Sequence, residues 1–152
     1  MSSESRQLVR RLFNELWNKG ALDQADEILA AGYVTHDPAT PDFGEGPEAE
    51  KQIVTLYRSG FPDLQLTIDH MIDVGNFVTA RFTARGTHQG EFWGIAPTNR
   101  LIRIEGTVVV RFSRGRIAER WVMWDALGLM QQLGVIPTLE KVKPQATKTT
   151  SN

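Results

Sequence analysis

Residues 64–85 read LQLTIDHMIDVGNFVTARFTAR, and this stretch decides the fold. Apolar residues occupy alternate positions before Gly75-Asn76 and again after it, with polar residues between them. Alternation with a period of two predicts β-strands, and Gly-Asn between two such runs predicts a tight turn. The stretch therefore predicts an antiparallel hairpin with one apolar face.

Two further strands follow the hairpin. Apolar residues alternate from Ile102 to Phe112, and Arg114-Gly115 supplies the next turn. The strand expected over 117–124 is apolar on both parities, so one of its faces could line a cavity while the other packs elsewhere. A short helix is expected over 126–133, closed by Gly134.

The first half of the chain has helical periodicity. Apolar residues recur every three or four positions from Leu8 to Trp17, which predicts an amphipathic helix. Further helices are expected over 23–30 and from Pro47 to Gly60, with a short extended piece at 33–36. Helices followed by an antiparallel meander predict an α+β fold, in which the helices pack on a curved sheet and leave a cavity.

Length and composition describe one ordinary globular domain. The chain has 152 residues, 23% of them charged, and we expect a single domain over 1–137 with a flexible tail over 138–152. Its net charge of −1 predicts no nucleic-acid surface, and the absence of cysteine excludes disulfides, thiolate metal sites and cysteine nucleophiles. With no signal-like or membrane-length apolar run, we expect a cytoplasmic protein without membrane contact.

Asp125 is the most informative polar residue. It follows Trp124 at the end of the last expected strand and precedes the helix expected over 126–133. One interpretation is an N-cap, because aspartate is a favoured capping residue. The other is a carboxylate facing an aromatic-lined cavity, where desolvation would make it a stronger base. The sequence leaves both open.

The three histidines, His36, His70 and His88, are the other polar candidates. No HxH or HxxxH pair occurs, so no metal site is predicted. His36 and His88 lie in or next to loops, where each could be a surface residue or could act as an acid or an orienting donor near Asp125. His70 shares the apolar parity of its strand, which predicts a core histidine or a polar group in the pocket wall.

Aromatic residues are frequent in the second half of the chain and could be core residues or the wall of a pocket for a flat apolar ligand. The residues expected to contact such a ligand, besides His70, are Phe92, Trp93, Trp121 and Trp124. Glu119 and Arg120 are expected to form cross-strand salt bridges. GxGxxG, P-loop and GxSxG motifs are absent, so neither a nucleotide cofactor nor a serine hydrolase is predicted.

Residues 86–98, GTHQGEFWGIAPT, resemble the signature loop of the SnoaL-like polyketide cyclases, which are also called ester cyclases. The resemblance covers about residues 6–136. Its other matching pieces are the His36 segment, Phe61-Pro62-Asp63-Leu64, Gly115-Arg116-Ile117, Glu119, Trp121, Asp125 and Gln132-Leu133-Gly134. Where the family often has Pro-Thr-Gly this chain has Pro97-Thr98-Asn99, and asparagine tolerates a left-handed backbone.

This resemblance implies a nuclear-transport-factor-2-like cone, in which N-terminal helices pack on a strongly curved, mainly antiparallel sheet around a pocket. It also implies a homodimer and a lyase or isomerase that needs no metal or organic cofactor. The reaction expected from it is aldol-type ring closure of a hydrophobic polyketide-like carbonyl compound. Asp125 occupies the place of the family's base, and His88 and His36 match positions that can support it.

Two other functions stay open, because one fold hosts many activities. The chain could be a small-molecule-binding or assembly module without catalysis, in which Asp125 is only a helix cap. It could also be a hydrolase in which the same carboxylate activates a water molecule.

Overall fold

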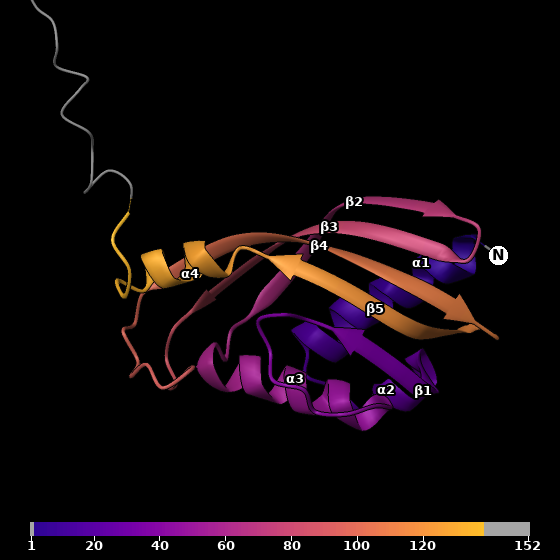
Figure 1. The fold of residues 1–152 in the computed structure, drawn as a ribbon, viewed down its shortest axis with the longest axis horizontal. Helices are drawn as coiled ribbons and strands as arrows, with labels where there is room; N and C mark the ends of the chain where they lie inside the picture. Colours follow the sequence, from indigo (N-terminus) through magenta and orange to yellow (C-terminus); the bar gives the residue numbers. More distant parts are fainter. Residues whose placement is uncertain (1, 139–152) are drawn as a thin grey trace, which may run out of the picture.

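Four consecutive strands form the predicted antiparallel meander (Figure 1). They are β2 (Gln65–Val74), β3 (Phe77–Thr87), β4 (Leu101–Ser113) and β5 (Arg116–Trp124). A fifth strand, β1 (Leu29–His36), pairs in parallel with β5, and the sheet has the order β1-β5-β4-β3-β2. The computed structural model describes residues 2–138, so the tail expected over 138–152 lies, apart from Thr138, outside the described residues.

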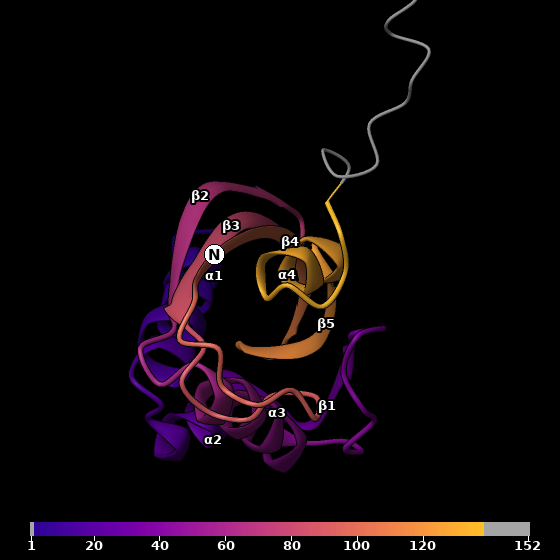
Figure 2. The same cartoon turned by 90° about the vertical axis from the view of Figure 1, so that its left-hand side faces the viewer.

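The helices confirm the predicted α+β class and its order. They are α1 (Ser2–Arg11), the π-helical turns η1 (Leu12–Asn18), the short η2 (Leu22–Gln24), α2 (Ala25–Ile28), α3 (Pro47–Gly60) and α4 (Ala126–Gln132). Figure 2 shows strands β2 to β5 forming a curved arc, with α2 and α3 on the side opposite its top. The helix expected over 23–30 is shorter, because Leu29 already pairs with Ile117 of β5. Among the described residues, no helix has the length and apolarity needed to cross a membrane.

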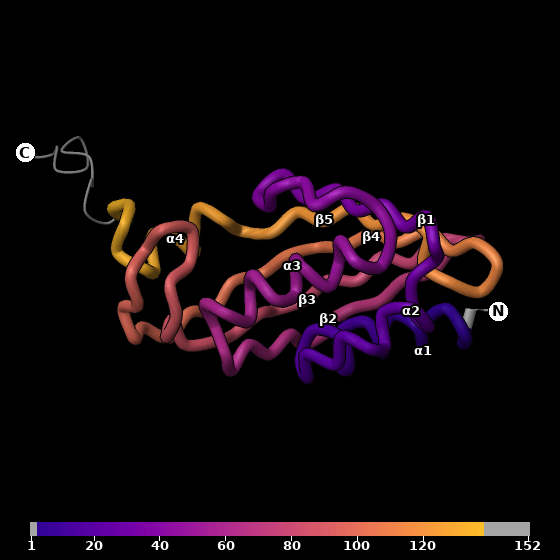
Figure 3. The backbone as a smooth tube through the Cα atoms, turned by 90° about the horizontal axis from the view of Figure 1, so that it is seen from below, coloured from indigo at the N-terminus to yellow at the C-terminus, as the bar shows by residue number. Residues whose placement is uncertain are grey.

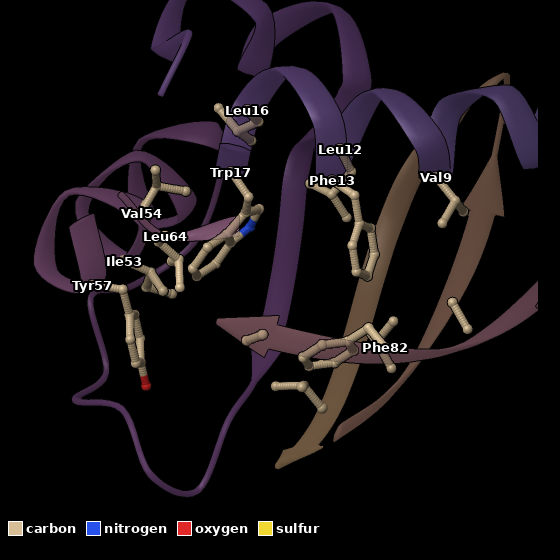
Figure 4. Close-up of a cluster of buried hydrophobic side chains, with 14 of the residues drawn as sticks. Val9, Leu12, Phe13, Leu16, Trp17, Ile53, Val54, Tyr57, Leu64 and Phe82 are labelled. Carbon is tan, nitrogen blue, oxygen red and sulfur yellow. The ribbon is translucent and has the colours of Figure 1, made fainter. Parts of the chain in front are cut away.

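The main core lies between the first helices and the concave face of the sheet. Figure 4 shows Phe13 of η1 pointing toward Phe82 of β3. The rings of Phe13 and Phe82 meet edge to face, with 5.6 Å between their centroids. The apolar side of the first helix therefore packs against the apolar face of the predicted hairpin.

A β-bulge in β2 overturns one prediction about the hairpin. The register shifts between Ile68 and His70, so His70 pairs with Arg81 and its side chain is exposed, whereas Met71 takes the inward parity. Ile72, expected on the apolar face, is 64% exposed. The predicted place of His70 in the core or pocket wall is therefore wrong, because one extra residue moves the following side chains to the other face.

The 88–99 loop is docked on the C-terminal end of α3, beyond which it extends in Figure 3. The backbone N–H groups of Gln89 and Gly90 both donate to the carbonyl of Gly60, at 3.0 and 3.1 Å. A Cβ atom on Gly90 would lie 2.0 Å from the carbonyl oxygen of Ser59, so only glycine allows this approach. Asn99 has a φ of 59°, which confirms the left-handed turn expected there.

Candidate functional site

A small cavity lies between the helices and the concave face of the sheet. The space in which a water molecule can sit is about 60 Å³, well below the roughly 300–1,000 Å³ of typical ligand pockets. Its lining residues are Trp17, Asp37, Tyr57, Phe61, Leu64, Leu66, Phe82, Ala84, Ile102, Ile104, Arg120, Val122, Trp124 and Leu129. The wall is mostly aliphatic and aromatic, and its charged groups are Asp37 and Arg120.

Arg120 reaches this cavity because of its parity in β5. It alternates with Trp121, whose side chain lies on the outer face, and shares the inward parity with Val122 and Trp124. The guanidinium is buried, with its side chain 8% exposed, and its Nη1 donates to Oγ1 of Thr35 at 2.8 Å. Glu119 forms the expected cross-strand salt bridge, with Arg111 of β4 at 3.2 Å, whereas the ion-pair partner of Arg120 is Glu50 of α3.

Behind Arg120 lies a buried carboxylate, that of Glu50 on α3. Its Oε1 is 3.8 Å from Nη1 of Arg120 and accepts a hydrogen bond from the hydroxyl of Tyr33 at 2.8 Å. Its Oε2 accepts from the indole Nε1 of Trp17 at 2.9 Å. Both charged side chains are thereby balanced and hydrogen-bonded, which is what burial of an ion pair requires.

Burial and charge together shift the pKa values of this network. Burial alone lowers the pKa of the Arg120 guanidinium, but the neighbouring negative charges, Glu50 first among them, more than offset it and raise the pKa above its ordinary value. Burial, followed by the charge of Glu50, raises the pKa of the Tyr33 hydroxyl well above its ordinary value. Tyr33 therefore stays protonated and remains a donor to Glu50.

Asp37 follows β1 directly and is held by a short polar chain. Its carboxylate accepts hydrogen bonds from the N–H of Ala39 at 3.0 Å and from the hydroxyl of Thr40 at 2.5 Å. Since Thr40 uses its only hydroxyl proton there, the Tyr57 hydroxyl donates to Thr40, at 2.7 Å. Burial, and next the charge of Asp37, raise the pKa of Tyr57 above its ordinary value, which keeps that hydroxyl a donor.

Asp125 is the N-cap of α4, as one of the two interpretations predicts. Its Oδ1 accepts a hydrogen bond from the N–H of Gly128 at 2.8 Å. A Cβ atom on Gly128 would lie 2.1 Å from Oδ2 of Asp125, so glycine makes room for the capping carboxylate. The Asp125 side chain is exposed and is not part of the cavity lining, which differs from the expectation of a carboxylate facing the cavity.

His36 and Trp121 lie together on the outer face of the sheet. Their rings stack with 5.4 Å between centroids, and Nε2 of His36 is 2.7 Å from Oε2 of Glu119. The hydrogen bond with His36, together with the cation of Arg111, lowers the pKa of Glu119. This outward position follows from the register, since His36 pairs with Trp121 and the side chains of paired residues share a face.

His88 and its loop lie beside the cavity. The His88 ring is fully buried, and its Nδ1 accepts from the backbone N–H of Thr98 at 3.2 Å, which leaves the proton on Nε2. Nε2 is the buried side-chain polar atom without a hydrogen-bond partner among the described residues. Within residues 2–138, no hydrogen bond joins Asp125 to His88 or His36.

The predicted aromatic residues are divided between three places. Trp124 lines the cavity, Trp121 is on the outer face, and the loop residues Phe92 and Trp93 stack on each other at 4.7 Å. Phe92 contacts the ring of Tyr57 at 5.3 Å and Trp93 contacts Trp124 at 5.8 Å, so the loop aromatics back the lining rather than form it.

The cavity's polar residues were not singled out by sequence reasoning. Arg120 had a usable signal, an arginine on the inward parity of a strand apolar on both sides. Glu50 and Asp37 had weaker ones, an acid on the buried side of an amphipathic helix and an aspartate next to His36. The described residues contain no group of three or more His, Asp or Glu side chains arranged to hold a metal ion.

Comparison with known proteins agrees with this geometry. Residues 7–133 match the profile of the SnoaL-like polyketide cyclases. The aklanonic acid methyl ester cyclase AcmA of Streptomyces galilaeus is 30% identical over 135 residues, which cover 87% of this chain and 92% of that protein. TsrD from Streptomyces laurentii superposes with a TM-score of 0.79 and 27% identity, covering 88% of this chain and 97% of its own.

IdmH from Streptomyces antibioticus superposes with a TM-score of 0.74 and 30% identity, covering 86% of this chain and 99% of its own. The matched residues 7–133 include the whole sheet, most of the helices and the 88–99 loop. They cover nearly all of the range, about residues 6–136, over which the sequence resembles the family. The nuclear-transport-factor-2-like α+β cone is thus confirmed, and the chain belongs to the SnoaL-like polyketide cyclase family.

Proposed function

We propose that this protein catalyses aldol-type ring closure of a hydrophobic carbonyl compound, with a carboxylate as its base. The observation that carries the proposal is the apolar and aromatic cavity whose charged groups are one carboxylate, Asp37, and one guanidinium, Arg120. The relative AcmA is named as a cyclase of a methyl ester, aklanonic acid methyl ester, and that compound is the substrate to test first.

The chemistry needs only groups that this chain has. The carboxylate takes a proton from a carbon between two carbonyl groups, which leaves an enolate. The enolate carbon attacks a second carbonyl carbon of the same molecule, and the resulting alkoxide takes the proton back from the carboxylic acid. One bond between carbons forms and the product is an isomer of the substrate. A positioned base of this kind contributes about 10²–10⁴-fold to the rate.

Two carboxylates are available for the base. Asp125 is the one that the family pattern implies, and Asp37 is the one that lines the cavity. The two lie at the same end of the molecule, since Asp37, Trp124 and Ala126 border one shallow hollow. We keep Asp125 as the base of the proposal and test it against Asp37.

The test is turnover of aklanonic acid methyl ester by purified variants, followed by liquid chromatography and mass spectrometry. Changing the true base to asparagine should lower kcat about 10²-fold or more while the ligand still binds. Asp26→Asn, with its side chain 72% exposed, is the matched control and should turn over normally. Full activity in both Asp125→Asn and Asp37→Asn would refute the carboxylate mechanism.

The mass of the product separates ring closure from hydrolysis. Ring closure leaves the mass unchanged, whereas hydrolysis of the methyl ester adds water and releases methanol. A product without its methyl group would therefore refute ring closure and support the hydrolase hypothesis, in which the carboxylate activates a water molecule.

A binding module without catalysis is the second candidate function, and two observations favour it. The cavity of about 60 Å³ is smaller than the roughly 300–1,000 Å³ of typical ligand pockets, and Asp125 already serves as a helix cap. This function predicts ligand binding with no product. Quenching of the fluorescence of Trp17 and Trp124, which line the cavity, measures binding independently of turnover.

We propose in addition that the protein forms a homodimer through the outer face of the sheet. The strand pairing aligns one row of side chains across this face, and two of them, Ile72 and Trp121, are apolar and exposed. The row contains Ile72, Thr79, Val109, Trp121 and His36. A second copy would cover it, and sedimentation velocity of Val109→Glu, with Val135→Glu as the control at an exposed apolar site outside the row, tests this.

A further inference from the structure

We infer that Arg120 binds a carbonyl oxygen of the ligand in the cavity and stabilises the negative charge that develops on it. The inference deepens the proposed function, since it names the group that holds the enolate oxygen. Sequence reasoning offered His36 and His88 as an acid or an orienting donor near the base, and treated Arg120 as a residue of cross-strand salt bridges. The chemical class of ligand is a planar carbonyl compound or its phenolic or enolic counterpart.

Among the described residues, the hydrogen bonds of Arg120 leave two of its three nitrogen atoms without an acceptor. A guanidinium has five N–H groups, and here only Nη1 is engaged, by Thr35 at 2.8 Å and by the charge of Glu50 at 3.8 Å. Nε and Nη2 donate to no acceptor within residues 2–138. Neither nitrogen is one of the fully buried atoms without a partner in that range, so both are accessible. Because Arg120 lines the cavity, a ligand in the cavity can reach them.

The surroundings hold the guanidinium in place without using those donors. Trp17 packs on Arg120, with 5.7 Å between the guanidinium carbon and the ring centroid. Glu50 is in turn fixed by Tyr33 and by Trp17, whose hydrogen bonds occupy one oxygen each. A cation held by a buried network, with apolar walls around its free donors, is preorganised for an oxygen that becomes negative in the reaction.

Carboxylates near Arg120 oppose the binding of a ligand that is already negative, but they do not oppose an enolate that forms in the cavity by proton transfer to one of them. Glu50 and Asp37 are the carboxylates that act on Arg120, and Tyr33 and Tyr57 are the neighbouring titratable hydroxyls. Before the reaction, a negative ligand meets these two carboxylates as well as the cation. If Asp37, the carboxylate that lines the cavity, is the base, proton transfer moves one negative charge from Asp37 to the oxygen at Arg120, and the total charge of the cavity is unchanged.

The test uses para-nitrophenol, a small planar phenol whose phenolate absorbs at longer wavelength than the phenol. Its titration in the presence and absence of the protein gives the ratio of phenolate to phenol affinity. Replacing Arg120 by methionine should lower this ratio about tenfold or more, because an opposite charge within about 4–6 Å favours the charged form by one or more pH units. Glu50 and Asp37 are present in both proteins, so their effect cancels.

A second variant covers the case in which Arg120→Met does not fold. Glu50→Gln/Arg120→Met has neither charge, and removal of Glu50 by itself would favour the phenolate. A lower ratio than in the wild type would therefore support the role of Arg120 even more strongly. The inference would be overturned by an unchanged ratio in Arg120→Met, by a ratio in the double variant no lower than that of Glu50→Gln alone, or by no binding of para-nitrophenol to the wild-type protein.

The outcome is separable from that of the proposed function. If the phenolate preference depends on Arg120 but no substrate is cyclised, Arg120 is an oxygen-binding residue of a binding protein and the proposed function fails. If aklanonic acid methyl ester is cyclised equally fast by the wild type and by Arg120→Met, the proposed function stands and the inference about Arg120 fails.

Discussion

Glu50 should be one of the residues on which the stability of this protein depends most strongly. Its carboxylate is 0% exposed, and the change Glu50→Gln removes the charge while keeping the shape of the side chain. The variant leaves the buried Arg120 without its partner. It also turns an amide N–H₂ toward Trp17 or Tyr33, both of which are donors.

The magnitude follows from the geometry. Two unit charges 3.8 Å apart interact by about 4 kcal/mol at an effective dielectric constant of about 20. Breaking a buried ion pair costs about 3–5 kcal/mol, and a buried donor without an acceptor costs about 1–3 kcal/mol. These contributions overlap, and we expect Glu50→Gln to lower the free energy of unfolding by about 4 kcal/mol.

Arg120→Met should cost a similar amount, and the double variant should cost less than the two single changes together. Once one charge is gone, the second is an unpaired buried charge whose removal is favourable. We expect a coupling free energy of about 2 kcal/mol or more. Urea unfolding followed by tryptophan fluorescence gives the four values that the cycle needs.

The control is Glu48→Gln on the same helix, whose side chain is 75% exposed and 3.7 Å from Lys51. It should change the unfolding free energy by less than about 0.5 kcal/mol. The reasoning is refuted if Glu50→Gln costs less than about 1 kcal/mol, or if the effects at Glu50 and Arg120 are additive.

Three further changes test other parts of the structure. Asp125→Ala should cost about 1 kcal/mol in urea unfolding through loss of the N-cap, whereas Asp125→Asn should cost much less; equal costs would contradict the capping role. Gly90→Ala should cost about 1–3 kcal/mol in the same measurement, because its Cβ would meet the Ser59 carbonyl; an unchanged stability would contradict the docked loop. Hydrogen bonds from the backbone and hydroxyl of Thr87 lower the pKa of Asp63, so its stabilising effect exists above about pH 3.9 and is lost on acidification. Unfolding of Asp63→Asn should accordingly be less acid-sensitive than that of the wild type, and identical pH profiles would refute this.

Much of the fold could be predicted from local pattern. Period-two alternation on both sides of Gly75-Asn76 predicted β2 and β3, and both strands are present with the expected turn. Pro47 and Gly60 were expected to bound a helix, and α3 has these limits. These predictions succeeded because turn chemistry and side-chain periodicity depend on neighbours in the sequence.

The candidate site was less predictable. Residue types suggested Asp125, His36 and His88, whereas the structure lines the cavity with Asp37 and Arg120. The interpretation of Asp125 as a cap needed only the strand-to-helix boundary, which is local. Whether a polar side chain faces the cavity depended on the packing of segments far apart in the chain.

The sequence by itself determined the order of helices and strands, the position of the turns, the α+β class and the family signature. Only the tertiary structure decided which faces those elements present. The bulge in β2 turned His70 outward, and the parallel pairing of β1 with β5 placed His36 on the outer face. Packing of α3 against the sheet brought Glu50 and Arg120 together across 70 positions of sequence. The physical reason is that period and turn chemistry act between neighbours, whereas register and burial are set by contacts that form only when distant segments meet.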